Sequence, residues 1–376
     1  MKKCVVISDS FKGTLSSLEI CKIAKEVIPT YLPGCQVEAI PVADGGEGTV
    51  DCFIEALGAE KISVPVHGPF GENLTACYGR RGTLAIVEMA AAAGLPLARD
   101  KKNPEQTGTF GVGELMAHAI DRGCREILLG LGGSATNDGG CGCAAALGAR
   151  FLRTDGAEFV PVGGTLGEIR SLDLSGLRNR LDGVKLTAMC DVDSPLYGTL
   201  GAAHVFAPQK GADPAMVERL DAGLRHLDEI FQKALGRSYA QISGAGAAGG
   251  MGAGCLALLG GELRPGIEAV LDTVDFDRRL EGADFVLTGE GRVDGQSFRG
   301  KVLSGVARRT RAKKVPLLVL GGGLTPEAEE GYEQGVTAMF SINRQPMALA
   351  DSAPLTPENY RRTLADLCRL LAAFHG

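Results

Sequence analysis

The chain has 376 residues, 45% of them hydrophobic and 22% charged, which is an ordinary composition for a soluble globular protein. A net charge of −6 without a basic run argues against nucleic-acid binding, and no apolar stretch is long enough for a membrane span or signal peptide. The eleven cysteines lack metal-site spacing, so we expect reduced thiols, no zinc and a cytoplasmic location.

The N-terminal part alternates apolar strands with amphipathic helices. A strand is predicted over residues 3–9, and a capping box formed by Ser16 and Glu19 opens the helix that follows. The next elements are a strand, a helix and a strand at residues 37–44, 49–57 and 61–66. This alternation is typical of βαβ units and a parallel sheet.

After residue 70 the alternation stops. Strands at 75–79 and 83–89 follow each other directly, which indicates an antiparallel or mixed sheet. The elements predicted next are helices at 110–122, from about 139 and at 214–235, and strands at 125–130 and 185–193.

The alternation returns near residue 275. The predicted strands are 283–291, 315–323 and 336–342, and the predicted helices are 301–312 and 357–372. We therefore expect an α/β protein of two domains. One is split between residues 1–70 and 275–376, and residues 71–274 form an inserted second α/β domain.

Glycine is about twice as frequent as usual, with 54 residues. Glycine-rich loops recur at 130–140 ("GLGGSATNDGG"), 244–254, 289–300 and 321–323. Such loops at strand ends expose backbone N–H groups that attract phosphate, so four of them suggest a polyanion such as a nucleotide. "GLGGSA" (130–135) and "GAGAAG" (244–249) match the spacing of a dinucleotide-binding motif, but a helix does not directly follow the first and no clear strand precedes the second. "GQSFRGKV" (295–302) resembles a P-loop, but Val302 stands where that motif needs Ser or Thr.

Charged residues gather in these loops and at the strand ends. The acidic ones could hold Mg²⁺ beside phosphates, and they are Asp9, Asp44, Glu47, Asp138, Asp191, Asp193, Glu290 and Asp294. The cations are Lys12, Lys210, Arg292, Arg299 and Lys301. All five could stabilise charge on a transferred phosphoryl group. Lys12 and Lys301 each stand beside a glycine just before a helix, whereas the simpler alternative for Lys210 and Arg299 is a solvated surface position. The five histidines show neither metal-ligand nor hydrolase spacing.

Seven stretches in the same order resemble the type I glycerate kinase family, and the resemblance runs over nearly the whole chain. They are "SDSFKGTLSS" (8–17), "VADGGEGT" (42–49), "GLGGSATNDGG" (130–140), "CDVDSPLYG" (190–198), "FAPQKGA" (206–212), "GAGAAGGMG" (244–252) and "TGEGRVDGQSFRGK" (288–301). The resemblance implies an ATP-dependent kinase that phosphorylates D-glycerate, usually to 2-phosphoglycerate, with 3-phosphoglycerate as the alternative. It also implies a flavodoxin-like domain joined to a restriction-endonuclease-like α/β domain.

Residue type and location suggest roles within that chemistry. We expect Asp191 to be the general base or a metal ligand, Lys12 to hold phosphate and Arg292 to hold the glycerate carboxylate, with Asp294 as a second metal ligand. The further expected substrate- or nucleotide-binding residues are Ser10, Gly13, Asp44, Gly45, Gly46, Gly132, Gly133, Ser134, Asn137, Asp138, Glu290 and Lys301. ATP and Mg²⁺ are the expected cofactors, and the active site is expected in a cleft between the domains.

Two other classes of function stay open at this point. A nucleotide-binding oxidoreductase would use "GLGGSA" and an acidic residue about 20 positions later, but Asp155 near that spacing lies in a hairpin-like turn. A non-enzymatic binding protein would not need so many charged groups in glycine loops. A homodimer is a candidate assembly.

Overall fold

The computed structural model describes residues 1–43 and 48–374. Contacts divide the chain into two units. Unit 1 comprises the described residues of 1–44, 55–58 and 267–376, and unit 2 those of 45–54 and 59–266. Both ends of the chain therefore belong to unit 1, and unit 2 lies between them in the sequence.

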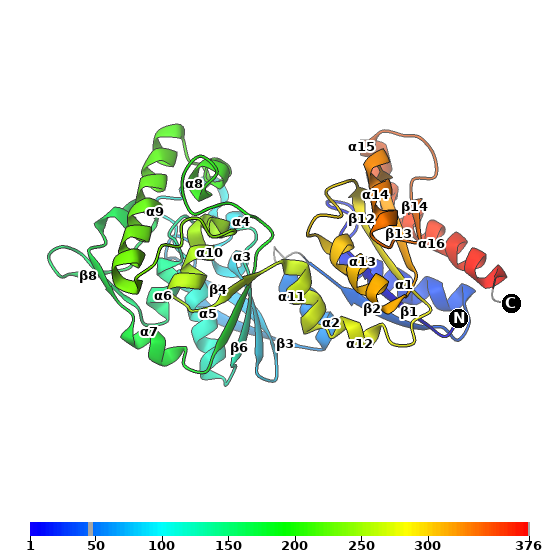
Figure 1. The fold of residues 1–376 in the computed structure, drawn as a ribbon, viewed down its shortest axis with the longest axis horizontal. Coiled ribbons are helices and arrows are strands. Elements are labelled where there is room, and N and C mark those ends of the chain that lie inside the picture. Colours follow the sequence, from blue (N-terminus) through cyan, green and yellow to red (C-terminus); the bar gives the residue numbers. More distant parts are fainter. Residues whose placement is uncertain (44–47, 375–376) are drawn as a thin grey trace. The chain divides into compact units, whose positions relative to one another are not determined.

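Unit 1 is built on a parallel sheet of five strands in the order β14-β13-β12-β1-β2. The strands are β1 (Lys3–Ser8), β2 (Gln36–Pro41), β12 (Phe285–Val293), β13 (Leu317–Leu324) and β14 (Ala338–Ser341). In Figure 1 the blue N-terminal strands lie beside the yellow and orange strands from the C-terminal part. Counted within the unit, the order is 2-1-3-4-5, and it reverses between β1 and β12, which is where such sheets bind ligands.

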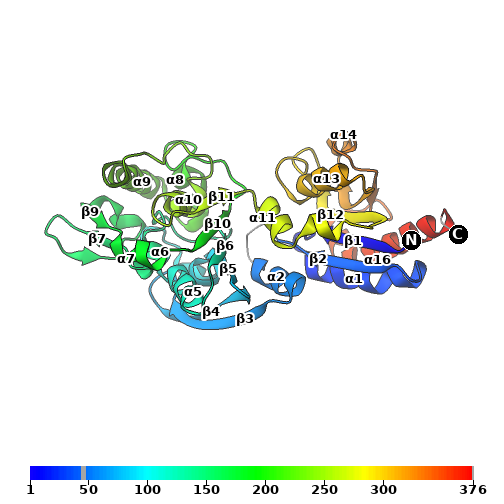
Figure 2. The same ribbon diagram turned by 60° about the horizontal axis from the view of Figure 1, so that its bottom comes forward.

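Helices cover both faces of this sheet. Helix α1 (Ser17–Tyr31) begins with the predicted capping box, in which Ser16 and Glu19 exchange hydrogen bonds, so that prediction is confirmed. Its apolar stripe and that of α16 (Thr356–Ala373) pack on one face, and α13 (Val302–Lys313) covers the other, as Figure 2 shows. The shorter helices are α11 (Gly266–Thr273), α12 (Phe276–Arg279), α14 (Glu330–Glu333) and α15 (Leu349–Ser352).

Unit 2 contains a mixed sheet of six strands in the order β11-β10-β6-β5-β4-β3. The strands are β3 (Glu60–His67), β4 (Asn73–Arg81), β5 (Leu84–Glu88), β6 (Glu126–Gly130), β10 (Lys185–Met189) and β11 (Glu262–Arg264). Strands β5, β6, β10 and β11 are parallel, and β4 is antiparallel to both β3 and β5.

The strand predicted at 61–66 therefore lies in this sheet and not, as expected, in one sheet with 1–57 and 275–376. The reason is the short connection "GPFGE", where the Gly68 N–H donates to the Glu72 carbonyl and turns β3 back onto β4. The antiparallel pairing of β3 with β4 therefore places β3 in the sheet of unit 2, although the strand–helix alternation before it predicted the sheet of unit 1.

The helices of unit 2 pack around a large apolar core. They are α2 (Thr49–Leu57, shared with unit 1), α3 (Met89–Ala93), α4 (Leu95–Ala98), α5 (Phe110–Asp121), α6 (Cys141–Ala146), α7 (Ser175–Arg180), α8 (Ala202–Phe206), α9 (Pro214–Leu235) and α10 (Ala247–Ala257). Strands β7 (Arg150–Leu152), β8 (Glu158–Phe159) and β9 (Ser171–Asp173) form a small separate sheet. Helix α9 buries its predicted stripe, including Leu220, Leu224 and Leu227, so it is a core helix.

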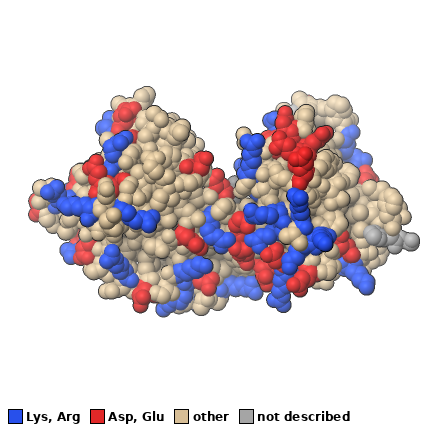
Figure 3. Space-filling model, in the orientation of Figure 1, with Lys and Arg blue, Asp and Glu red and all other residues tan. Residues whose placement is uncertain are grey.

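Surface charge is mixed where Figure 3 shows it. Over α11, α12 and α13, Arg309 pairs with Glu268, Asp272 and Asp277, and acidic side chains gather over α14. The eleven cysteines are free, and all but Cys77 and Cys190 are buried. In the described part of the chain, no helix is long and apolar enough to cross a membrane.

Candidate functional site

In unit 1, several of the predicted residues lie at the carboxyl ends of β1 and β12, beside the point where the strand order reverses. The Asp9 N–H and the Ser8 hydroxyl both donate to the Gly289 carbonyl, each at 2.9 Å, and hold the loop after β1 against β12. A side chain on Gly291 would lie 3.2 Å from the Phe11 Cα, so glycine permits this close approach. Ser10 and the exposed Lys12 therefore lie next to the end of β12.

Glu290 is the most buried of the acidic residues at this edge, with 9% of its surface exposed. Its Oε1 atom has no hydrogen-bond partner in the described part of the chain. Burial raises the pKa of this carboxyl, the charges of Asp9 and Asp294 raise it further, and Ser297 and Lys301 act in the opposite direction. A buried carboxylate oxygen without a partner is a vacant ligand position for a cation or a donor.

The remaining predicted residues of unit 1 lie on the segments that follow β1 and β12 and near the end of β12. Arg292 is exposed and its Nε lies 3.7 Å from the Asp294 Oδ2, while the Asp294 Oδ1 accepts the Gln296 N–H. Lys301 is the N-cap residue of α13, and Gly13 has a φ of +78° with no atom near its Cβ position. The structure thus brings the predicted cations of this unit to the same edge as Glu290.

The residues at this edge suit Mg²⁺ without forming a cage for it. Among the residues that the structure describes, no three His, Cys, Asp or Glu side chains come together as a metal site. Mg²⁺ needs only one or two carboxylates when substrate phosphates complete its shell, and the unpartnered Glu290 oxygen meets that need. Of the two expected metal ligands, Asp294 follows β12 at this edge and Asp191 belongs to unit 2. The expected residues Asp44, Gly45 and Gly46 lie outside the described residues.

In unit 2, the parallel strands also present polar groups at their carboxyl ends. Glu88 ends β5 and lies in register with Gly130, which ends β6; Gly130 in turn lies beside Met189 at the end of β10. Strand β10 ends at Met189, earlier than the predicted 185–193, so Asp191 lies two residues beyond its end. The Asp191 side chain is exposed, and its Oδ1 accepts the Gly266 N–H at 2.7 Å.

The loop after β6 divides into an accessible part and a buried part. Gly133 is exposed with a φ of +74°, and Gly132 is half-buried. Asp138 is fully buried and accepts hydrogen bonds from the Thr109 N–H and hydroxyl and from the Gly140 and Gly142 N–H groups. Burial raises its pKa, against the effect of these donors. Asp138 therefore holds the loop in place from within.

The side chains of Thr136 and Asn137 have unpaired polar atoms inside this loop. Both residues are fully buried, and the Thr136 hydroxyl and both polar atoms of the Asn137 amide lack partners in the described part of the chain. Buried polar groups are normally satisfied, so these atoms mark a place that a water or ligand would complete.

Gly139 of this loop and Gly249 of the loop at 244–252 are explained by the protein's own packing. A side chain on Gly139 would collide with Leu227, and one on Gly249 with the Thr136 carbonyl. The loop at 244–252 thus presses against 136–140, and the Gly139 N–H donates to the Gly249 carbonyl. Only Gly132 and Gly133 are accessible enough to meet a phosphate, which narrows the role expected for "GLGGSATNDGG".

Two further residues stand out that were not among the expected site residues. Lys210 is 2% exposed, and its Nζ donates to the Ser134 Oγ at 3.0 Å and the Thr136 carbonyl at 2.7 Å. The surface interpretation of Lys210 is therefore wrong. Glu88 is 7% exposed and accepts the Val50 N–H. Its position at a strand end, in the same setting as Asp9 and Asp191, was the available signal.

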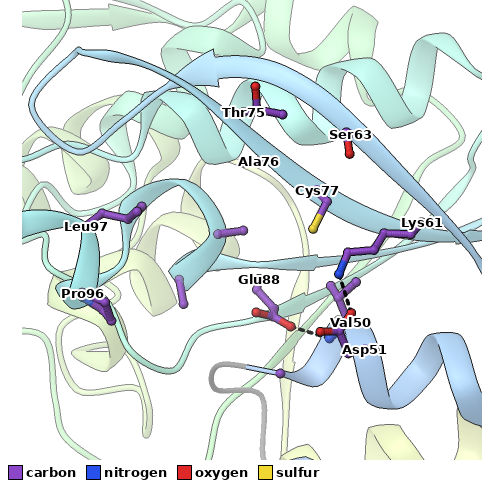
Figure 4. A pocket seen from close by; sticks show the side chains of 13 residues that line it. Val50, Asp51, Lys61, Ser63, Thr75, Ala76, Cys77, Glu88, Pro96 and Leu97 are labelled. Carbon is purple, nitrogen blue, oxygen red and sulfur yellow. Dashed lines mark hydrogen bonds and ion pairs between the residues drawn. The ribbon is translucent and has the colours of Figure 1, made fainter.

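A cavity of about 450 Å³ opens beside Glu88 in unit 2, within the size range of ligand pockets. Figure 4 shows Glu88 next to Val50 and close to the ion pair between Lys61 and Asp51, whose atoms are 2.6 Å apart. Its other lining residues are Gly48, Ser63, Thr75, Ala76, Cys77, Ala90, Ala91, Pro96 and Leu97. Gly133 lies against Ala90, so the glycine loop backs one wall of this cavity, whose lining combines apolar side chains with a few polar and charged ones.

Parallel α/β sheets that end in carboxylates, lysines and accessible glycines define a class of enzymes that handle phosphorylated ligands. The model of the glycerate kinase family matches residues 4–372, and the chain belongs to this family. The protein is accordingly a kinase, a phosphotransferase that uses ATP, and the oxidoreductase and binding-protein alternatives fall away.

Named relatives match this chain over almost its full length. The chain is 44% identical to a glycerate kinase of Bacillus cereus over 368 residues, 97% of each protein. It is 40% identical to a glycerate 2-kinase of Escherichia coli K12, over 98% of this chain and 95% of the relative. A crystal structure from Salmonella typhimurium LT2, described as a candidate glycerate kinase 2, superposes with a TM-score of 0.89 at 40% identity and covers 100% of this chain and 99% of its own.

Proposed function

We propose that the protein transfers the γ-phosphate of ATP to the 2-hydroxyl of D-glycerate. The observation that carries this proposal is the family match over residues 4–372, together with the full-length relative named glycerate 2-kinase. The 3-hydroxyl is the alternative acceptor. The strand order 2-1-3-4-5 supports a flavodoxin-like unit 1, and the inserted unit 2 remains our candidate for the restriction-endonuclease-like domain. The cleft, the homodimer and the cytoplasmic location stay predictions.

In this reaction some of the named residues would stabilise negative charge, and one would accept a proton. Lys12 would hold phosphate oxygens and Arg292 the glycerate carboxylate, since its planar guanidinium binds both oxygens. Asp191 would accept the proton of the attacking hydroxyl or bind the metal. Glu290 and Asp294 would hold Mg²⁺, which when bound neutralises charge on the phosphates.

The reaction itself can be tested with purified protein. ADP release, followed by a coupled assay, is expected only when D-glycerate, ATP and Mg²⁺ are all present. Phosphorus NMR of the product then distinguishes 2-phosphoglycerate from 3-phosphoglycerate. ADP formation that is indifferent to D-glycerate would refute the proposed acceptor, and 3-phosphoglycerate would refute the proposed position.

Replacing Glu290 with glutamine should raise the Mg²⁺ concentration needed for half-maximal rate by about tenfold or more, because an amide oxygen is a weaker ligand than a carboxylate. A Mg²⁺ titration of the initial rate measures this directly. Glu281→Gln is the matched control, since Glu281 is an exposed acidic residue of the same unit that precedes β12, at the opposite end of that strand from this edge. An unchanged Mg²⁺ requirement in Glu290→Gln would remove Glu290 from the metal site.

A further inference from the structure

Lys210 lies buried beneath the loop after β6, at the end of a short helical turn that precedes α9. The residue is 2% exposed, and its ammonium donates on both sides of Ala135, to the Ser134 hydroxyl and to the Thr136 carbonyl. Burying a lysine is costly unless its hydrogen bonds are satisfied, so these contacts fix both the lysine and the loop.

The direction of the hydrogen bond to Ser134 follows from the chemistry of the ammonium group. A protonated lysine has three donors and no acceptor, so the Ser134 oxygen accepts and its proton points elsewhere. In the described part of the chain, the Ser134 hydroxyl donates to no acceptor. Ser134 directly follows Gly133, the exposed residue of the loop. An unused, oriented O–H beside accessible backbone is suited to an anionic oxygen.

We propose that Lys210 is a positioning residue that makes the Ser134 hydroxyl a donor to an oxyanion of the bound substrate. The shared chemistry is a phosphoryl or carboxylate oxygen, so the partner is either ATP or glycerate. This inference rests on the proposed function and on the expectation from the sequence that Gly132, Gly133 and Ser134 bind substrate or nucleotide. Lys210 itself touches no substrate and acts through Ser134.

The proposal predicts a pH dependence with a definite sign. A neutral lysine amine has a lone pair, so the Ser134 hydroxyl would turn inward and donate to it. Burial lowers the pKa of Lys210 to about 7, and Asp138, the charged group that acts on it among the described residues, works in the opposite direction. The donor of Ser134 is therefore offered below that pKa and withdrawn as the pH rises through it.

Kinetics of four variants test this: Lys210→Arg, Lys210→Met, Ser134→Ala and the double variant Ser134→Ala/Lys210→Met. In the wild type, the KM of either ATP or glycerate should rise between about pH 6 and pH 9, and that KM identifies the partner. Ser134→Ala should raise the same KM about 10- to 100-fold at low pH and remove its pH dependence. Lys210→Arg, which stays charged, should also lose the pH dependence.

The double variant separates positioning from a general structural role. If Lys210 acts through Ser134, the double variant should be no worse than Ser134→Ala, whereas additive losses would overturn the proposal. A pH dependence of KM that persists in Lys210→Arg or in Ser134→Ala would also overturn it, even if Lys210→Met fails to fold. Lys233→Met, at an exposed lysine of α9, is the control and should behave as wild type.

Failure of the proposed function has a different signature. If the wild type does not phosphorylate glycerate, the function itself is wrong. If the wild type does so and Ser134→Ala retains normal KM values for both substrates, the function stands and the role of Lys210 is refuted.

Discussion

Replacing Asp191 with asparagine is expected to lower kcat by about 10²–10⁴-fold while the protein stays folded. Asparagine keeps the size of aspartate and its hydrogen-bonding oxygen, but it cannot accept a proton from glycerate and is a poor Mg²⁺ ligand. The Asp191 carboxylate is exposed at the end of β10, and one oxygen accepts the Gly266 N–H. Steady-state kinetics with D-glycerate and ATP measure the loss.

A Mg²⁺ titration of this variant separates the two proposed roles. If Asp191 binds the metal, high Mg²⁺ should restore part of the rate. If it is the general base, Mg²⁺ should have no effect, and the pH–rate profile should lose its acidic limb.

The competing interpretation is that Asp191 only fixes the chain through Gly266, which an asparagine oxygen could do equally well. Asp193→Asn is the matched control, because Asp193 is an exposed aspartate of the same loop. Near-normal kcat and KM in Asp191→Asn would support the purely structural role and move the catalytic assignment to Asp294 or to Asp44, which lies outside the described residues.

Local signals in the sequence predicted much of the fold. The capping box at Ser16, the apolar stripe of α9 and the short β-branched strands of unit 1 each depend on residues close together in the chain. The same holds for the positions of Asp9, Glu290 and Asp191, because a polar residue at or just after the carboxyl end of a parallel strand lies at the edge where such sheets usually bind ligands.

What could not be predicted depends on distant partners. The short sequence around Lys210, "PQKGA", resembles an exposed turn, and only the packing of the loop after β6 over it buries the ammonium. Strand β3 lies in the sheet of unit 2 and not in the expected one, because it pairs with β4. The glycines at 139 and 249 looked like phosphate contacts, since close approach of another backbone leaves the same sequence pattern as close approach of a ligand.

The variant Gly249→Ala tests whether the glycine at 249 serves close packing of backbone or contact with a ligand. If it serves packing, the variant should be strongly destabilised. Gly249 has a φ of +68°, which costs alanine about 1–2 kcal/mol. Its new methyl would also lie 2.6 Å from the Asn137 Cα and collide with the Thr136 carbonyl, and both are backbone atoms that cannot rotate away. Such overpacking adds about 1–3 kcal/mol. The midpoint of urea unfolding measures the combined effect.

Alanine variants at two other glycines of unit 2 separate the cost of a positive φ from the cost of overpacking. Gly260 has a φ of +63° with no atom within 4 Å of its Cβ position, so Gly260→Ala should show the conformational cost alone. Gly167 has neither a positive φ nor a neighbour within 4 Å, and Gly167→Ala should be nearly neutral. From the most to the least stable, the expected order of the variants is Gly167→Ala, Gly260→Ala and Gly249→Ala. If Gly249→Ala is as stable as Gly260→Ala, the two loops are not pressed together, and the bare backbone at 249 must be explained by a ligand after all.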